Sequence, residues 1–356
     1  MLTKDSESWA DGNNHIDIGK WADLFVIAPA TANTINKLSN GIADNLITQS
    51  ALAYKGIKLI APAANTNMYK NPLTTASLKM LKLINYEVIE PIDKLLACGD
   101  EGMGALALVD DIFYASLRVL KTDEFWRDRK VVVSGGGTVE KIDDVRFISN
   151  FSSGKMAKEL AKALYLKGAD VCLITTKQFD DLPKNIHTIE VDSSQEMGEY
   201  LVDAIRVSKK GIVTKASLMG GEVPEIIQKK PYLFMLAAVS DYKPKFPQEG
   251  KMKKESIGDV WHMELEKNID ILNDLDKDGI FSVGFKAEMD EKNGEEHAKA
   301  MLESKNLDAV CLNYVNDNIF GSDENEITLF TKTEIIKFER ASKFDISMEL
   351  LSELGK

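Results

Sequence analysis

The chain has 356 residues, of which 44% are hydrophobic and 28% charged, as is ordinary for a soluble protein of two globular domains. Its formal net charge of −12 argues against nucleic acid as a partner, because neutralising phosphate groups requires a basic surface. No apolar run reaches the roughly 18 residues of a membrane span, and the polar residues 1–12 lack the apolar core of a signal peptide. The cysteines Cys98, Cys172 and Cys311 make no disulfide framework, so we expect a cytoplasmic protein with no membrane partner.

The first half of the chain alternates apolar runs with helix-period segments, which is typical of a parallel sheet with crossover helices. A glycine-punctuated loop surrounds Cys98, and the charged stretch 121–130 reads as a linker. We therefore expect one domain over residues 1–124 and a second over 125–356. The elements expected in the first domain are strands at 24–28, 57–61 and 86–89 and helices at 33–54, 74–84 and 110–120.

The second half starts afresh with KVVVSGGG (130–137), a strand that runs into three glycines. A long polar loop leads to an expected helix over 154–167, and a strand at 170–175 completes a unit typical of Rossmann-like domains. The pattern predicts an α/β fold with two such domains, whereas residues 206–230 show weak periodicity. Later strands are expected at 232–237, 280–285, 308–312 and 327–330.

The segment SGGGTVEKIDDVRFISNFSSGK (134–155) carries the densest polar chemistry. Glycines after a strand let backbone N–H groups approach a ligand, and the following helix N-terminus offers the positive end of a dipole. The spacing matches neither the dinucleotide-binding fingerprint nor the Walker loop. A phosphate site and a plain turn both account for the glycines, and the polar crowding favours the phosphate site. The crowded side chains are Arg146, Ser149, Asn150, Ser152, Ser153 and Lys155.

Two further segments of this half have a nucleotide-binding and a plain interpretation. LAAVSDYKPK (236–245) leaves a strand through small residues into Asp241, where a flat ring and a ribose or metal-bound phosphate would fit. A capped turn explains this segment equally well. GKMKKES (250–256) places Lys251, Lys253 and Lys254 on a loop, which is either a solvated charge run or a clamp for a polyphosphate.

Three residues of the first half are candidates with ordinary alternatives. His15 precedes the first strand, Asn65 follows the second, and Cys98 lies in a loop between Gly99 and Gly102. A surface histidine, a turn asparagine and a buried cysteine are the plain interpretations, although structural cysteines usually lie inside apolar elements. The other histidines show no metal-ligand spacing, so we expect no zinc site.

Together these motifs resemble those of one family, the bifunctional coenzyme A biosynthesis proteins, in which phosphopantothenoylcysteine decarboxylase is fused to phosphopantothenate–cysteine ligase. The resemblance covers about residues 13–356 and keeps the motif order. The decarboxylase half is represented by HIDIGKWADL, APATANTINKLSNGIADNL, PAANTNMY and ACGDEG. The ligase half is represented by VRFISNFSSGKM, AAVSDY, KMKK, KNIDI, VGFKAE and FGSDENEITLF.

For the second half the resemblance implies a ligation in two steps. The carboxylate of 4′-phosphopantothenate attacks the α-phosphate of CTP to give an acyl-cytidylate and pyrophosphate, and the amine of L-cysteine then displaces CMP. By resemblance, Asn150 stabilises the acyl-cytidylate, Lys251 assists its formation as a positioned cation, and Arg146 positions the acid or phosphate. The other residues implied at the CTP site are Met235, Leu236, Ala237, Asp241 (directly or through Mg²⁺), Ser282, Val283, Gly284, Phe285 and Lys305.

For the first half the resemblance implies a flavin-dependent decarboxylation. FMN oxidises the cysteinyl thiol of the substrate, and the resulting thioaldehyde loses CO₂ readily because it can accept the carbanion's electrons. His15 is implied as the catalytic histidine, Asn65 as the residue that holds the substrate carboxylate, and Cys98 as a proton donor. The residues implied as FMN contacts are Thr31, Asn33 and Thr34.

The sequence departs from the family pattern at several places. Family members begin with a further strand and a glycine-rich loop that grips the FMN phosphate, so we expect an N-terminally incomplete flavodoxin-like domain before the ligase domain. Met301 stands where a second lysine usually lies, one helical turn before Lys305. Ala64 replaces the usual methionine before Asn65, and Ala105 replaces an arginine.

Two other classes of function stay open at this point. The 130–175 unit could bind NAD(P) in an oxidoreductase, although the dinucleotide fingerprint is absent. The chain could also be a non-catalytic flavin-domain binding protein, which would leave the 146–155 cluster and Lys251 without a role. The family resemblance implies a homo-oligomer, with a dimer formed through the ligase domain.

Overall fold

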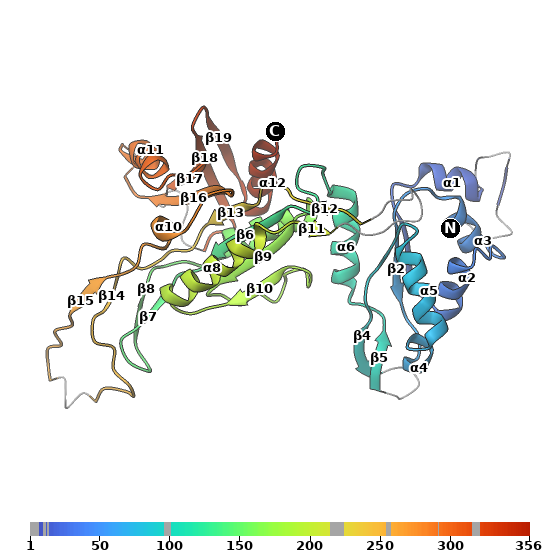
Figure 1. Ribbon diagram of the computed structural model, residues 1–356, viewed down its shortest axis with the longest axis horizontal. Coiled ribbons are helices and arrows are strands. Elements are labelled where there is room, and N and C mark those ends of the chain that lie inside the picture. The colour runs from blue at the N-terminus through green and yellow to red at the C-terminus, as the bar shows by residue number, and fades with distance from the viewer. Residues whose placement is uncertain are drawn as a thin grey trace. The chain divides into compact units, whose positions relative to one another are not determined.

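The computed structural model describes residues 7–9, 12, 14–95, 101–213, 224–253, 258–290, 292–314 and 321–356 (Figure 1). The chain divides into two compact units. The first unit is Met1–Thr122 with Val213–Ile227, and the second unit is Asp123–Ile212 with Gln228–Lys356. Among the described helices, none has the length and apolar character that a membrane crossing requires.

The first unit is built on a three-stranded parallel sheet of order β1-β2-β3. Its core packs Ile27 and Ile60 of the sheet against Ile35 and Leu81 of the flanking helices, all of them buried. The strands are β1 (Phe25–Ala30), β2 (Lys58–Pro62), β3 (Tyr86–Val88), β4 (Ile92–Leu95) and β5 (Glu101–Ala105). The helices are α1 (His15–Trp21), α2 (Ala32–Ser39), α3 (Leu46–Ala53), α4 (Thr66–Tyr69), α5 (Pro72–Lys82) and α6 (Val109–Lys121).

The single helix expected over 33–54 was wrong, because the structure has the two helices α2 and α3 there. Gly41 takes a φ of +67°, which a residue in a right-handed helix does not adopt. Asn45 then starts α3 with a capping box: its side chain accepts from the backbone N–H of Thr48, and its own N–H donates to the Thr48 hydroxyl. The loop expected around Cys98 is flanked by an antiparallel hairpin of β4 and β5, while Cys98 itself lies outside the described residues.

The second unit is built on an eight-stranded sheet of order β10-β9-β6-β13-β16-β17-β18-β19. The strands from β10 to β17 pair in parallel, and the last two are antiparallel. The strand order therefore reverses between β6 (Lys130–Gly135) and β13 (Tyr232–Met235), as in Rossmann-like sheets that bind ligands at this switch point. The α/β fold class expected from the sequence is confirmed.

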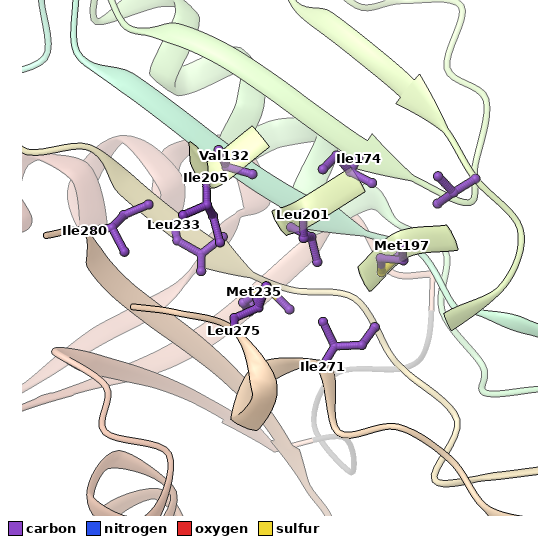
Figure 2. Packing of buried hydrophobic residues seen from close by; sticks show 11 residues of the cluster. Val132, Ile174, Met197, Leu201, Ile205, Leu233, Met235, Ile271, Leu275 and Ile280 are labelled. Atoms are coloured by element: carbon purple, nitrogen blue, oxygen red, sulfur yellow. The ribbon is translucent and has the colours of Figure 1, made fainter. Parts of the chain in front are cut away.

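Helices cover both faces of this sheet, because alternate residues of a strand point to opposite sides. Val132 of β6 belongs to an apolar cluster with Leu201 and Ile205 of α8, and Figure 2 shows this packing. Gly135, which lies on the opposite face of the same strand, contacts α7 so closely that an added Cβ would stand 2.5 Å from the Ala157 methyl. The helices are α7 (Lys155–Leu166), α8 (Ser194–Ser208), α10 (Ile271–Asp274), α11 (Gly294–Ser304) and α12 (Lys343–Leu354).

Two short hairpins extend from this sheet and were not expected from the sequence. The polar loop that we expected before the 154–167 helix contains β7 (Val139–Lys141) and β8 (Phe147–Ser149), which pair antiparallel. The strands β14 (Tyr242–Pro244) and β15 (Leu265–Lys267) form the base of an arm that reaches away from the sheet (Figure 1). The remaining strands of this unit are β9 (Asp170–Thr175), β10 (His187–Glu190), β16 (Phe281–Glu288), β17 (Ala309–Tyr314), β18 (Glu324–Thr331) and β19 (Ile335–Ser342). The chain also has β11 (Ile212–Val213) and β12 (Ile226–Ile227), of which β12 belongs to the first unit.

Candidate active sites

The glycine turn after β6 lies at the switch point and approaches neighbouring backbone closely. Gly136 has a φ of +82°, and an added Cβ would stand 2.2 Å from the Thr176 hydroxyl. A Cβ on Gly137 would stand 2.5 Å from the carbonyl oxygen of Asn150. Both positions therefore require glycine for space, and the first requires it for conformation as well.

The segment after β13 is tied to this turn by a chain of hydrogen bonds. The N–H of Ala238 donates to the Gly136 carbonyl at 2.8 Å, and the N–H of Ser240 donates to the Thr138 hydroxyl at 3.1 Å. The side-chain amide of Asn150 donates to the Val239 carbonyl at 3.0 Å. Asn150 thus lies beside the 235–241 segment, far from it in sequence but adjacent in the fold.

A cavity of about 880 Å³ opens beside this segment, within the second unit. It is lined by the ends of β13 and β16, the 267–272 segment and one face of α11. Five of the residues implied at the CTP site line it. They are Met235, Ala237, Asp241, Phe285 and Lys305.

The remaining residues implied at the CTP site have other positions. Leu236 lies between two lining residues, and its N–H donates to the Ser134 hydroxyl at 3.2 Å. Ser282, Val283 and Gly284 are buried in β16 and are not among the lining residues, and Ser282 is bonded to Asp308 instead. Only the carboxyl half of the strand, from Phe285 onward, reaches the cavity.

Cations and carboxylates face one another across the cavity lining. Lys305 donates to Asp270, Lys286 lies 3.2 Å from Glu288, and His297 Nδ1 lies 3.0 Å from the same carboxylate. Desolvation raises the pKa of Asp270, but the hydrogen bonds from Lys305 and from a backbone N–H outweigh it and leave the pKa below its usual value. The two carboxylates therefore stay ionised, and an entering polyphosphate would compete with them for the cations.

Lys251 lies on the arm that β14 and β15 begin, and its two neighbours anchor it. The N–H of Gly250 donates to Asp144 at 2.9 Å, and the N–H of Met252 donates to Asp143 at 3.3 Å. Asp143 is buried and also accepts from the guanidinium of Arg146 at 3.1 Å. The backbone on either side of Lys251 is therefore anchored, and the Lys251 side chain is exposed and open to a ligand.

Burial and hydrogen bonding act in opposite directions on Asp143. Desolvation raises the pKa of this carboxyl, but three backbone N–H groups and the charge of Arg146 outweigh it and hold the pKa below its usual value. The Arg146 guanidinium also lies 5.4 Å from the Trp261 ring, in the segment of the arm that leads back to β15. Arg146 therefore joins the β7–β8 hairpin to both sides of the arm.

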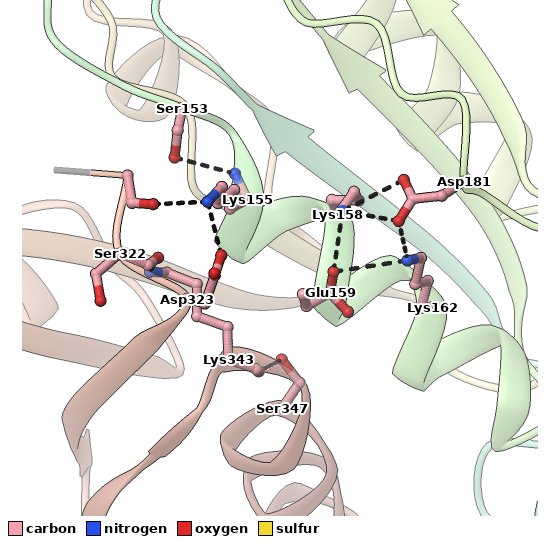
Figure 3. A network of polar contacts seen from close by, with 11 residues as sticks. Ser153, Lys155, Lys158, Glu159, Lys162, Asp181, Ser322, Asp323, Lys343 and Ser347 are labelled. Atoms are coloured by element: carbon pink, nitrogen blue, oxygen red, sulfur yellow. Dashed lines mark hydrogen bonds and ion pairs between the residues drawn. The ribbon is translucent and has the colours of Figure 1, made fainter.

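The N-terminus of α7 is held by a separate polar network, shown in Figure 3. The Lys155 ammonium donates to Asp323 at 2.6 Å and to the Gly321 carbonyl at 2.7 Å. One turn later, Lys158 and Lys162 both bind Asp181, at 2.9 and 2.6 Å. Lys155 thereby ties the phosphate-loop candidate to the start of β18, which carries the FGSDENEITLF motif.

In the first unit, the candidate FMN residues lie at the carboxyl end of β1. The Thr31 hydroxyl caps α2 by accepting from the N–H of Thr34, and Thr31 and Asn33 are exposed. The N–H of Ala63 donates to the Ala30 carbonyl at 2.9 Å, so the loop that holds Asn65 starts beside this turn. Asn65 caps the single turn α4 by accepting from the N–H of Asn67 at 2.9 Å.

His15 is the first residue of α1, and it has a partner that the sequence did not reveal. Its Nδ1 lies 2.6 Å from the carboxylate of Glu7, and both side chains are about four-fifths buried, with 21% and 18% exposure. The sequence shows an acidic N-terminal segment but gives no sign of which carboxylate turns toward the ring. Asp270 and His297 were missed in the same way, since their partners lie in other elements of the fold.

Comparisons with known proteins match both halves of the chain. The family described as Flavoprotein matches residues 2–121, and the family described as DNA/pantothenate metabolism flavoprotein C-terminal domain matches residues 126–217 and 207–356. The Coenzyme A biosynthesis bifunctional protein CoaBC of Haemophilus influenzae is 36% identical over 344 residues, covering 96% of this chain and 80% of that protein.

Two further matches are a second curated relative and a solved structure. A cysteine/cysteine sulfinic acid decarboxylase of an unknown prokaryotic organism is 34% identical over 353 residues, covering 96% of this chain and 91% of that protein. Among solved structures, the C-terminal domain of a coenzyme A biosynthesis bifunctional protein CoaBC aligns with a TM-score of 0.50 at 28% identity. That alignment covers 65% of this chain and 97% of the other.

Proposed function

The chain belongs to the family of coenzyme A biosynthesis bifunctional proteins, enzymes with a decarboxylase and a ligase activity, and on that premise we propose how its residues divide the work. The cavity of the second unit binds CTP and carries out the ligation of 4′-phosphopantothenate to L-cysteine. The observation that carries this proposal is the convergence of Met235, Asp241, Phe285 and Lys305 on one cavity from three segments of the chain: the end of β13 with the residues after it, β16, and the end of α11.

The chemistry of ligation uses Lys305 of this cavity together with Asn150 and Lys251, which are not among the residues that line it. A carboxylate becomes an acylating agent only when it carries a leaving group, so the acid first attacks the α-phosphate of CTP and pyrophosphate departs. Lys251 and Lys305 neutralise the charge that builds up on the phosphates, and Asn150 hydrogen-bonds the acyl-cytidylate. Arg146 holds the arm that presents Lys251, through its contacts with Asp143 and Trp261.

Magnesium at this site would depend on the nucleotide as well as on the protein. Among the residues that the structure describes, no group of three or more His, Cys, Asp or Glu side chains could hold a metal ion. Mg²⁺ is commonly bound through one or two carboxylates together with substrate phosphates. Asp241, exposed at the cavity rim, supplies such a carboxylate once the triphosphate is present.

The ligase proposal is tested by following pyrophosphate and product together. The purified chain is incubated with CTP, Mg²⁺, 4′-phosphopantothenate and L-cysteine, and phosphopantothenoylcysteine is measured by mass spectrometry. We expect product formation that requires all four components and that falls at least about a hundredfold in Asn150→Ala. Turnover with a nicotinamide cofactor in place of CTP would instead support the oxidoreductase alternative.

For the first unit we infer an FMN-dependent decarboxylation of phosphopantothenoylcysteine. FMN, when bound, would take two electrons from the cysteinyl thiol and return them to the enethiol that remains after CO₂ has left. The exposed Thr31 and Asn33 offer hydrogen-bonding groups at the end of β1, where a flavin would lie in a sheet of this type. His15 takes a proton from the substrate, Asn65 holds the substrate carboxylate, and Cys98 donates a proton as the product forms.

A flavin absorbance spectrum of the purified protein tests this inference. We expect a flavin spectrum, either as isolated or after addition of FMN, and CO₂ release from phosphopantothenoylcysteine. A protein that FMN cannot reconstitute would be a ligase with a non-catalytic flavin-type unit. Because one relative is named a cysteine decarboxylase, free cysteine is offered as a second substrate. A preference for free cysteine would show that the first unit is a cysteine decarboxylase and not a phosphopantothenoylcysteine decarboxylase.

We also propose that the chain works as a homo-oligomer, with a dimer formed through the second unit. Several large apolar side chains of the second unit are exposed, including Phe151 at 84% and Val260 at 68%. Exposed apolar side chains of this size commonly lie at contacts between subunits. Light scattering at micromolar concentration should give the mass of at least two chains, whereas the mass of one chain would contradict the proposal.

A further inference from the structure

We propose that Glu7 is a positioning residue that fixes the orientation and the tautomer of His15. This inference rests on the proposed role of His15 in decarboxylation. The segment around Glu7 carries none of the motifs on which the family resemblance rests. It is the contact with the histidine ring that gives Glu7 a function.

One oxygen of the Glu7 carboxylate receives two hydrogen bonds from His15. The ring Nδ1 lies 2.6 Å from Oε1, and the backbone N–H of His15 donates to the same oxygen at 3.1 Å. These bonds hold the backbone and the ring of one residue against one acceptor. The hydrogen bond from the ring, followed by that from the backbone, lowers the pKa of Glu7, so the carboxylate stays ionised when it meets the ring.

An ionised carboxylate accepts hydrogen bonds but donates none, so the ring nitrogen facing it carries the proton. In the neutral imidazole, His15 is then protonated on Nδ1, and its Nε2 keeps a free lone pair. Nε2 is the nitrogen that can take a proton from a substrate and return it. The contact therefore selects which of the two ring nitrogens works as a base.

A second contact, with Trp9, also restricts the orientation of the His15 imidazole. The indole of Trp9 lies edge-on to the imidazole, with 5.6 Å between ring centroids and an interplanar angle of 86°. Such a T-shaped pair restricts the ring's rotation about its side-chain bonds. Glu7 and Trp9, two residues apart, thus contact the same ring from one short segment.

Capping of helix α1 does not by itself explain the Glu7 contact. Asn14 already caps this helix, since its side chain accepts from the N–H groups of Ile16 and Asp17, each at 3.0 Å. Glu7 satisfies one more backbone donor, but a cap needs no bond to the ring. The 2.6 Å bond to Nδ1 is what a positioning role requires and a capping role does not.

The test reads the tautomer directly and does not require bound flavin. The chain has four histidines, and the ¹⁵N spectrum of the histidine-labelled protein assigns His15 by comparison with His15→Asn. We expect the wild type to show the Nδ1–H tautomer. In Glu7→Ala the ratio of the tautomers should move by about tenfold or more toward Nε2–H, as expected when a hydrogen bond to a charged group is lost.

Two variants separate positioning from general effects on stability or charge. Glu7→Gln keeps an oxygen acceptor and should retain the Nδ1–H tautomer. Asp17→Asn removes one negative charge two residues from the ring, where the carboxylate bonds Asn14 and not His15, and should leave the tautomer unchanged. An unchanged His15 tautomer in folded Glu7→Ala would overturn the proposal.

Activity gives a second, independent readout. If the flavin-loaded chain decarboxylates, Glu7→Ala should lower kcat by about tenfold or more while KM stays the same, and Glu7→Gln should lie closer to wild type. A shifted tautomer with unchanged kcat would overturn the positioning role. A wild type without decarboxylase activity would refute the proposed function of the first unit, and the tautomer would still decide the Glu7–His15 contact.

Discussion

The two units of this chain differ in how their candidate residues come together. In the second unit, five residues implied at the CTP site meet at one cavity, because the carboxyl ends of the neighbouring parallel strands β13 and β16 open onto it. In the first unit, the described candidates lie at the starts of three separate helices: His15 in α1, Thr31 and Asn33 at α2, and Asn65 at α4, with Thr31 and Asn33 exposed. The fold brings the candidates of the second unit to one cavity through converging strand ends, whereas each candidate of the first unit is held by contacts at its own helix start.

The largest expected effect tests whether the two units are separate structures, each with its own unfolding transition. Leu164 of the second unit and Leu81 of the first are both fully buried, and a leucine-to-alanine change in such a core costs about 2–5 kcal/mol. Calorimetry of Leu164→Ala should lower the transition of the second unit alone, and Leu81→Ala that of the first alone. Equal shifts of both transitions in both variants would show one cooperative body.

The second prediction concerns Lys251, which the arm presents as an exposed cation. Lys251→Met should lower kcat for pyrophosphate release by about a hundredfold or more, because a positioned charge on the reacting phosphates is lost. Lys245→Met is the matched control, since Lys245 lies at the base of the same arm and pairs with Glu264 at 3.1 Å. Equal losses in both variants would mean that the arm needs charge in general and not Lys251.

The third prediction tests the close approach at the glycine turn. Gly136 and Gly279 both have positive φ, +82° and +69°, but only Gly136 has neighbours within 4 Å of an added Cβ. Gly279→Ala should cost about 1–2 kcal/mol from backbone conformation alone, and Gly136→Ala about 1–3 kcal/mol more from the contact with Thr176. Equal losses of unfolding free energy, measured in urea, would contradict the crowded geometry of the turn.

The smallest expected effect is a pH dependence at the α7 network. Desolvation raises the pKa of Asp181, but hydrogen bonds from Lys162 and Lys158 outweigh it and lower the pKa to about 2. A lowered pKa contributes stability that is present above the unfolded value of about 3.9 and is lost as the pH falls toward the folded one. Asp181 is 54% exposed, so Asp181→Asn should cost less than about 1 kcal/mol at pH 7.

This prediction is checked by measuring unfolding of Asp181→Asn and of the wild type across the acid range. The difference in unfolding free energy should shrink between about pH 4 and the folded pKa of about 2. A difference that stays constant over this range would mean that Asp181 contributes through packing and not through its charge.

The sequence predicted the parts of this molecule that are set by local pattern. The strand at 130–135, its glycines and the helix after Gly154 follow from hydrophobic runs and conformational freedom, and the structure has them in that order. The prediction of one helix over 33–54 was wrong because the helical spacing of apolar residues continues across the break between α2 and α3. The break is marked by the capping box at Asn45, which depends on only two side chains. The β7–β8 hairpin was missed because strands of three residues in a polar stretch leave no apolar alternation.

Long-range pairing set the limit on predicting the sites. Asp270 and Lys305 are 35 residues apart, and Lys155 and Asp323 are 168 residues apart, so no spacing in the sequence indicates either pair. Position along a strand was the other limit. Ser282 and Phe285 belong to one strand, but of the two only Phe285 reaches the cavity, while Ser282 is buried within the sheet.

The central claim is that the second unit activates a carboxylate with CTP before cysteine attacks. The most direct measurement is a rapid-quench experiment with the purified chain, CTP, Mg²⁺ and 4′-phosphopantothenate, with L-cysteine withheld. We predict one pyrophosphate released per functional cavity and a bound acyl-cytidylate, from which added cysteine liberates CMP. Absence of pyrophosphate release until cysteine is present, or release without 4′-phosphopantothenate, would contradict the account.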